Sequence, residues 1–262
     1  MDWANYPLIF NLLHISLIHE KFKAMKTILS LLTLAALSLS LPSCMFLGPS
    51  VKGDGEVKEK VREVAEFHGI RVTSGMNVHL IQGDQQKVVV AADANLHELI
   101  ETKVEDGILE IKALANIWHA KEKNVFVTAP DLSEISGTAG SNIYTDNQLK
   151  AGKIHIKGSA GSNMHISING QNMEISANSG SNIFIEGTAD ELIIKTSSGA
   201  NIKAGDLSAS KCDAKANSGG NLWINAVKEL TADASSGGNI FYSGSPEIIS
   251  SNASTGGNII KK

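Results

Sequence analysis

The stretch "SANSGSNIFIEG", residues 176–187, decides the fold because the chain repeats it. It joins a glycine, a small residue and an asparagine to an alternating apolar segment. The same Gly-x-Asn-apolar element begins at Gly140, Gly161, Gly180, Gly199, Gly219, Gly237 and Gly256, and a weaker copy begins at Gly75. The seven full copies are 18 to 21 residues apart. A near-constant period of about 20 residues is the signature of a solenoid.

Two alternating segments flank each glycine. After the repeat asparagine come pairs such as Ile183 and Ile185, whose period of two places them on one face of a strand. Seven residues before the glycine stand Ile154, Met173, Leu192, Cys212, Leu230 and Ile249, and five before it stand Ile156, Ile175, Ile194, Ala214, Ala232 and Ser251. We expect these positions to point inward. The pattern predicts an all-β parallel β-helix, or solenoid, with coils of about 19 residues.

The Gly-x-Asn element is interpreted as a corner between strands. Glycine allows positive φ, and asparagine tolerates the left-handed region and bonds to nearby backbone. Stacked once per coil, the asparagines can form a ladder of amide hydrogen bonds. The predicted ladder consists of Asn142, Asn163, Asn182, Asn201, Asn221, Asn239 and Asn258. A row of amides that faces outward and binds sugar hydroxyls is the alternative.

The chain divides into five predicted segments. Residues 136–262 hold the repeats, and residues 56–135 form a more irregular β-rich part, with one helical turn expected at 95–100. Residues 44–55 contain Gly, Pro and Ser and predict a tether. Residues 25–43 predict a signal peptide, and residues 1–24 are interpreted as a start codon assigned too early, with a membrane-proximal extension as the alternative.

The signal is of the bacterial lipoprotein type. A charged start at Lys26 precedes the apolar run 28–41, which is too short for a bilayer that needs about 20 apolar residues. Cys44 follows directly and is predicted to carry the lipid, although Pro42 departs from the usual small or aliphatic residue. An ordinary secretory signal is the alternative. A lipid at Cys44 would anchor the protein to the membrane and leave Cys212 without a disulfide partner.

Composition and motifs argue against catalysis, metal binding and nucleic-acid binding. The formal net charge is −4 and the arginines are Arg62 and Arg71, so no nucleic-acid partner is expected. Acidic residues in the repeats are scattered singly, and His155 and His165 on neighbouring coils lack the converging ligands that a metal needs. Cys212 stands in an apolar column and is read as a small buried hydrophobe. We therefore expect no catalytic residue, no metal, no cofactor and no enzyme.

Aromatic residues provide the candidate binding face. Phe184, Trp223 and Phe241 stand two residues after the repeat asparagine, and Tyr144 and His165 occupy the same register. Alternation predicts that this register points outward, and an exposed aromatic column suits a glycan or another protein. Coverage by the N-terminal β-rich part or by a loop is the alternative.

The chain resembles a known family at three places. These are the Gly-x-Asn-Ile corners, the segment FHGIRV at 67–72 and the segment VFVTAPDL at 125–132. They resemble the head GIN domain over about residues 62–260. The resemblance implies a right-handed parallel β-helix and an exported or lipid-anchored protein described as an auto-transporter adhesin. It brings no catalytic residues, and the repeats run to Lys262, so we expect the lipid to hold the protein to its membrane.

These observations predict a non-enzymatic, lipid-anchored protein of the bacterial cell envelope, at the outer membrane or the cell surface. Its expected role is an adhesin-like binding module for a glycan or a protein. The alternative is a carbohydrate-active enzyme, a polysaccharide lyase or hydrolase, because parallel β-helices host both classes and the fold alone does not choose.

Overall fold

The computed structural model describes Lys26 and residues 50–262. The predicted early start at 1–24, most of the predicted signal peptide at 25–43 and the predicted lipid site at Cys44 lie outside the described residues. One compact unit spans Pro49–Lys262 and contains every strand described. Within the described residues, no helix has the length and apolar character needed to cross a membrane.

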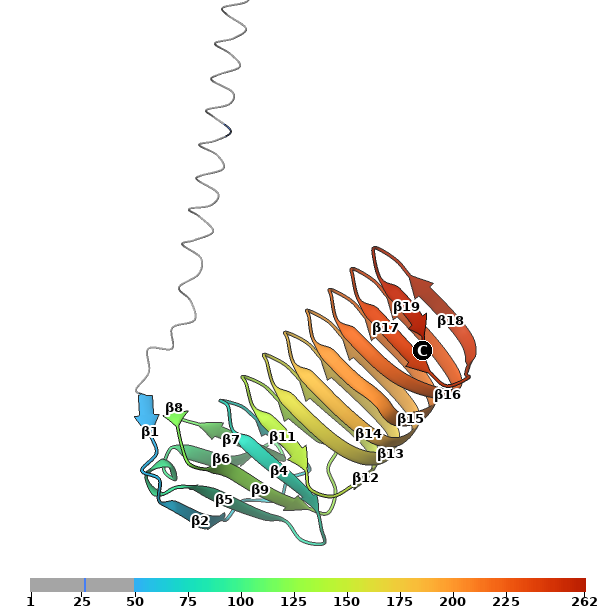
Figure 1. Cartoon of the computed structure of the whole chain (residues 1–262). Coiled ribbons are helices and arrows are strands. Elements are labelled where there is room, and N and C mark those ends of the chain that lie inside the picture. Colours follow the sequence, from blue (N-terminus) through green and yellow to red (C-terminus); the bar gives the residue numbers. More distant parts are fainter. Residues whose placement is uncertain (1–25, 27–49) are drawn as a thin grey trace, which may run out of the picture. The chain divides into compact units, whose positions relative to one another are not determined.

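The predicted solenoid is confirmed (Figure 1). Its long strands are β13 (Asn163–Ala177), β14 (Asn182–Thr196), β15 (Asn201–Ala216) and β16 (Asn221–Ala234), each paired in parallel with the next. The first part of β13 pairs with β11 (Asn142–Thr145) and its second part pairs with β12 (Leu149–Gly158). Each long strand therefore contributes to both sides of the coil.

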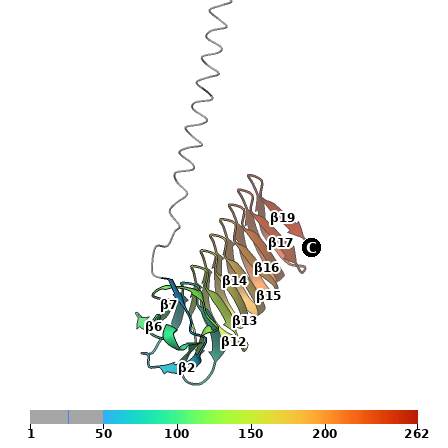
Figure 2. The ribbon, with the colours of Figure 1, turned by 60° about the vertical axis from the view of Figure 1, so that its left-hand side comes forward.

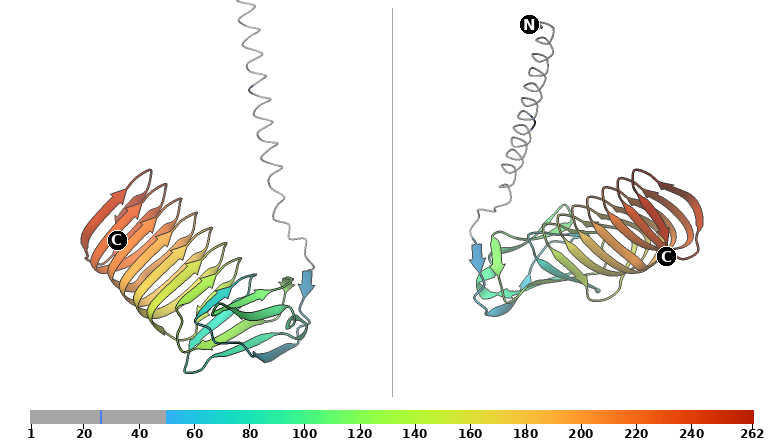
Figure 3. Two further views of the ribbon diagram at one scale, coloured as in Figure 1. Left: turned by 180° about the vertical axis from the view of Figure 1, so that it is seen from behind. Right: turned by 45° about the horizontal axis from the view of Figure 1, so that its top comes forward.

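The two sides run the length of the solenoid (Figures 2 and 3). The first side consists of β9 (Lys123–Ala129), β4 (Asn77–Gln82), β11, the first halves of β13 to β16, β17 (Asn239–Ser243) and β19 (Asn258–Lys261). The second side consists of β7 (Ile108–Ala113), β3 (Gly69–Val72), β10 (Glu134–Gly137), β12, the second halves of β13 to β16, and β18 (Glu247–Ala253). The N-terminal β-rich part thus continues both sides.

Antiparallel strands cover the N-terminal end of the solenoid. β5 (Lys87–Asp93) pairs antiparallel with β9 and with β2 (Val57–Arg62), and β6 (Ile100–Glu105) pairs antiparallel with β7. The helical turn expected at 95–100 is a short 3₁₀ turn at Ala94–Leu96. These pairings leave β2 and β6 as the edge strands at this end, and the charged side chains Lys58, Glu59 and Lys60 on β2 discourage pairing with another chain.

The predicted tether at 44–55 is wrong for residues 50–55. β1 (Ser50–Lys52) pairs in parallel with β8 (Asn116–His119), and the backbone N–H of Gly53 donates to His119 O at 2.8 Å. The buried Asp93 carboxylate then accepts the N–H groups of Gly55, Lys121 and Glu122 at 2.9 to 3.1 Å. This carboxylate fastens the segment to the unit, a contact that composition alone does not reveal.

Asp93 makes the folded unit sensitive to acid. Burial acts to raise the pKa of Asp93, but the N–H groups of Glu122, Lys121 and Gly55 act against it, and the net pKa is lowered. A lowered pKa stabilises the fold above the unfolded pKa of about 4, and that contribution is lost as the pH falls from there through the folded-state pKa. We expect Asp93→Asn to lower Tm at pH 7 and to lower it less at pH 3, where protonation has removed part of the contribution of the carboxylate. Thermal unfolding at both pH values measures this, and an equal loss at both would contradict it.

The core consists of the inward columns. The residues seven positions before the repeat glycine are buried from Ile154 to Leu230. The residues five positions before it are buried from Ile156 to Ala232. The prediction fails in the last coil, where Ile249 is 58% exposed and Ser251 is exposed. The register of β18 slips between Ile248 and Ser250, which leaves Ile249 unpaired with β16. No described strand lies beyond this coil to bury it.

The corner has a different geometry from the one expected. Positive φ occurs at the residue before the glycine and at the glycine itself, for example 49° at Ser179 and 72° at Gly180, whereas Asn182 already begins β14. The N–H of Ser181 donates to Asn178 O at 3.1 Å. Two consecutive positive φ values closed by this bond define a type I′ turn. The asparagine is therefore the first strand residue after the turn.

The asparagine amides form an unbroken chain of hydrogen bonds. Each Nδ2 donates to the Oδ1 of the preceding coil, from Asn142 to Asn77 through to Asn258 to Asn239, at 2.8 to 3.2 Å. Asn77 continues the chain to Asn124 at 3.1 Å. Each such bond contributes about 1 kcal/mol, so the amides hold neighbouring coils in one register.

Gly180 and Gly187 of the same coil both have positive φ, but only Gly187 lacks room for a side chain. A Cβ at Gly180 would meet no atom within 4 Å, whereas a Cβ at Gly187, whose φ is 125°, would lie 2.0 Å from Ile168 O. We expect Gly180→Ala to cost about 1 to 2 kcal/mol through φ alone. Gly187→Ala should cost more because the backbone of the adjacent coil must shift. Urea unfolding compares the two, and equal losses would contradict the close contact.

Candidate functional site

The candidate binding residues stack into one column on the first side. The aromatic column is defined as the outward residues two positions after Asn124 and after each ladder asparagine from Asn77 to Asn239: Phe126, His79, Tyr144, His165, Phe184, Lys203, Trp223 and Phe241. Ile260 follows Phe241 in the same line. The first five rings of the column are stacked with centroids 5.1, 5.3, 5.5 and 4.6 Å apart. Parallel in-register pairing produces this column, because it places the same position of every coil in line.

Lys203 interrupts the rings. Its Nζ lies 4.7 Å from the centroid of the Phe184 ring, a cation–π contact. Stacking resumes beyond it, where Trp223 and Phe241 lie 5.3 Å apart. Phe184 and Trp223 are therefore the two rings that border the break in the column.

The structure brings together all five residues of the predicted face. Tyr144, Phe184, Trp223 and Phe241 are half-buried, because their neighbours cover part of each ring, and His165 is exposed. The N-terminal part extends this column through His79 on β4 and Phe126 on β9. The sequence analysis missed both residues, although each stands two positions after an asparagine, as the repeat register requires.

A groove of about 640 Å³ opens at the break in the column. It is lined by Thr145, His165, Ile166, Ser167, Phe184, Ile185, Glu186, Lys203, Gly205, Asp206 and Trp223. The strand pairing of β15 shifts register against both β14 and β16 at this point. Asn201 and Asn221 are 20 residues apart, against 19 for Asn182 and Asn201, and this longer step was the signal available in the sequence.

The groove holds two carboxylates on adjacent coils. Glu186 and Asp206 are direct partners across β14 and β15, and both are exposed. Neither forms an ion pair within residues 50–262. The expectation that acidic residues of the repeats are scattered singly is therefore wrong here, because adjacent coils bring together residues 20 positions apart in the chain.

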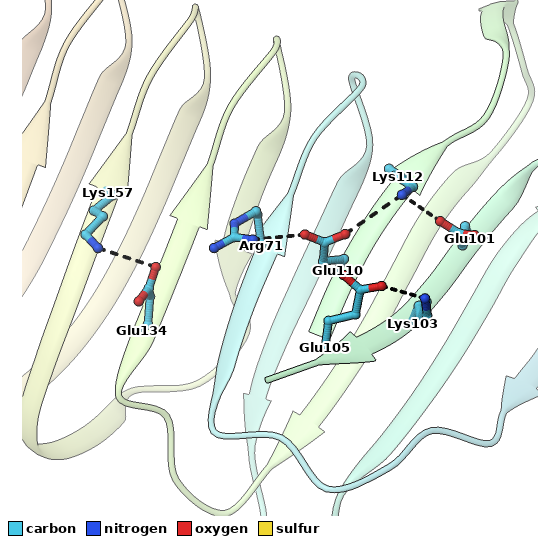
Figure 4. A network of polar contacts seen from close by, with 8 residues as sticks. All are labelled: Arg71, Glu101, Lys103, Glu105, Glu110, Lys112, Glu134 and Lys157. Atoms are coloured by element: carbon cyan, nitrogen blue, oxygen red, sulfur yellow. Dashed lines mark hydrogen bonds and ion pairs between the residues drawn. The ribbon is translucent and has the colours of Figure 1, made fainter. Parts of the chain in front are cut away.

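Charges on the second side are arranged differently. Figure 4 shows Arg71 bonded to Glu110, Lys112 bonded to Glu101 of the neighbouring strand β6, and Lys157 facing Glu134. The N–O distances of these pairs are 2.9, 2.8 and 3.5 Å. Further along, Lys195 faces Glu174 at 3.2 Å and Lys211 faces Glu229 at 3.5 Å. Exposed pairs of this kind contribute about 0 to 1 kcal/mol each. They leave this side electrically balanced, in contrast to the groove.

The remaining candidate groups do not converge. His155 lies on the second side, where its Nδ1 is 3.3 Å from Glu174 Oε2, whereas His165 lies on the first side. Within the described residues, no group of three His, Cys, Asp or Glu side chains could hold a metal ion. Cys212 is buried, and burial followed by the nearby Asp213 charge raises the pKa of its thiol to about 12. The thiol therefore stays protonated at neutral pH.

A β-solenoid with an aromatic groove on one side defines the class of protein. Residues 66–246 match the family described as "Putative auto-transporter adhesin, head GIN domain", and the chain belongs to this family. No curated protein matches the chain.

Solved structures share the fold. A "putative adhesin" from Bacteroides fragilis is 23% identical with a TM-score of 0.72, over 81% of this chain and 100% of that one. A "Putative lipid binding protein" from Parabacteroides distasonis is 20% identical with a TM-score of 0.67, over 82% and 100%. A "putative adhesin" from Parabacteroides merdae is 19% identical with a TM-score of 0.63, over 81% and 99%.

Proposed function

We propose that this protein is a non-enzymatic, adhesin-like binding module of the bacterial cell envelope, which holds a glycan or a protein against the first side of its solenoid. The observation that carries the proposal is the groove at the break in the aromatic column. It combines ring surface, hydroxyl groups, two carboxylates and one ammonium group in about 640 Å³, a volume within the range of ligand sites. The description of the family as adhesins supports the same role.

The envelope location and the lipid anchor are part of the proposal. The charged start, the apolar run 28–41 and Cys44 supply a lipoprotein signal. Lipid at Cys44 would place the compact unit a few residues from the membrane, since that unit begins at Pro49. The partners of the protein would then be the membrane, through the lipid, and the ligand of the first side, with no nucleic acid.

Replacement of the lipidated residue tests the anchor. We expect Cys44→Ala to move the protein from the membrane fraction to the soluble fraction, because acyl chains supply the membrane affinity. Fractionation of cells that express either form, followed by detection of the repeats, measures the change. Cys212→Ala is the matched control and should leave the distribution unchanged. Retention of the Cys44→Ala form in the membrane would contradict the lipid anchor.

The rings that border the groove provide the test of binding. We expect Phe184→Ser and Trp223→Ser each to weaken binding at least tenfold, because one well-placed aromatic contact is worth about 1 to 3 kcal/mol. Binding of the unit Pro49–Lys262 to arrays of glycans and of extracellular proteins measures this. Trp118→Ser is the matched control, because Trp118 is 62% exposed on β8, outside the aromatic column. Unchanged binding by both groove variants, with retained circular dichroism, would contradict the proposal.

A carbohydrate-active enzyme remains the second candidate because of one observation. Glu186 and Asp206 face one groove, and glycoside hydrolysis uses a pair of carboxyl groups. The glycan array distinguishes the two functions when bound and released sugars are both analysed. Retention of intact glycans supports the binding module, whereas cleavage that is lost in Glu186→Gln supports the enzyme.

A further inference from the structure

We propose that the groove is a subsite for an uncharged, hydroxyl-bearing sugar ring, held between Phe184 and Trp223 and bonded by Glu186, Asp206 and Lys203. This inference rests on the proposed binding function and names the class of its ligand. It also makes the break at Lys203, and not the continuous part of the aromatic column, the contact region.

Phe184 and Trp223 each have one ring face that no other ring of the column covers. Phe184 uses one face against His165, at 4.6 Å and 5°, and Trp223 uses one face against Phe241. Their other faces look toward the strand of Lys203, which lies between them. Two strand spacings separate the two rings, about 9 to 10 Å. Contacts of about 3.5 to 4 Å on each side leave room for one sugar ring.

Lys203 occupies this space with a side chain that can move. It is exposed, and its Nζ contacts the face of Phe184 at 4.7 Å. An exposed cation–π contact is worth about 0.5 to 1 kcal/mol, which an incoming ring can replace. The lysine stem is flexible, so the ammonium group can turn outward and donate to a hydroxyl oxygen of the ligand.

The two carboxylates of the groove are expected to repel each other. Like charges directly opposite each other on adjacent strands are destabilising. On the second side Glu229 is also directly opposite a carboxylate, that of Glu247, but Glu229 faces Lys211 at 3.5 Å. Glu186 and Asp206 lack such a partner within residues 50–262. Adjacent carboxylates can accept hydrogen bonds from neighbouring hydroxyl groups of one sugar ring, which accounts for their presence.

The charge of the groove selects among sugars. Two carboxylates against one ammonium leave a net charge of −1 among Glu186, Asp206 and Lys203. A carboxylated sugar would bring a further negative charge next to them and would be repelled. The groove therefore favours neutral hexoses and N-acetylhexosamines over uronic or sialic acids.

Amide variants of the carboxylates test the inference. We expect Glu186→Gln and Asp206→Asn each to weaken binding of the unit Pro49–Lys262 to neutral oligosaccharides about tenfold, because a hydrogen bond to a charged group is worth about 1.5 to 3 kcal/mol. The urea midpoint of each variant should stay equal or rise, since like-charge repulsion is relieved. Asp190→Asn is the matched control, because Asp190 is an exposed carboxylate on the same strand outside the groove.

The probes are immobilised neutral oligosaccharides, their uronic-acid and sialylated counterparts, and extracellular matrix proteins. Selective binding of neutral sugars that is lost in the Glu186, Asp206, Phe184 and Trp223 variants, but not in Asp190→Asn, supports the inference. Protein binding that needs Phe184 and Trp223 but not the carboxylates overturns the inference and leaves the proposed function standing. A preference for acidic sugars also overturns it. Binding to none of the probes overturns both.

Discussion

The parallel, in-register stacking of successive coils is the constraint on which the rest of the structure depends. Each asparagine amide donates to the amide one coil earlier, so a coil cannot slip without breaking a bond of 2.8 to 3.2 Å. The type I′ turn before each asparagine fixes the same starting point in every coil. A slip by one residue would also turn every inward side chain outward. Amide ladder, turn and core therefore enforce one register together.

Because of this register, the residues at one position of the repeat lie in line on the surface of the solenoid. Two residues after the asparagine, the register makes the aromatic column, from Phe126 on β9 to Phe241 on β17. On the second side it brings residues of opposite charge together, as with Lys157 and Glu134 in Figure 4. The first half of each long strand thus contributes to an aromatic surface, and its second half contributes to a surface of balanced charges. A solenoid needs no loop to build a site, because neighbouring coils supply aligned side chains.

The groove arises where the repetition is broken. In β15 the register shifts around Gly205 and Asp206, and Lys203 stands where its neighbours carry rings. The rest of the column has ring faces that cover each other, whereas the break exposes faces, carboxylates and an ammonium group together. A departure from a regular pattern that is unfavourable to the fold is a reasonable place to seek function. The proposals about the ligand therefore concern this coil.

The sequence by itself determined the solenoid, the inward columns up to Leu230 and five of the eight members of the aromatic column, because a strict period of about 19 residues fixes which positions align. The same logic could have found His79 and Phe126, which follow Asn77 and Asn124 by two residues. Only the tertiary structure decided the rest. The pairing of Glu186 with Asp206 depends on a register shift in β15, and the fastening of residues 50–55 depends on a buried carboxylate at Asp93. Both are contacts between residues at least 20 positions apart, and the longer step from Asn201 to Asn221 marks the unusual coil but not the side chains that it pairs.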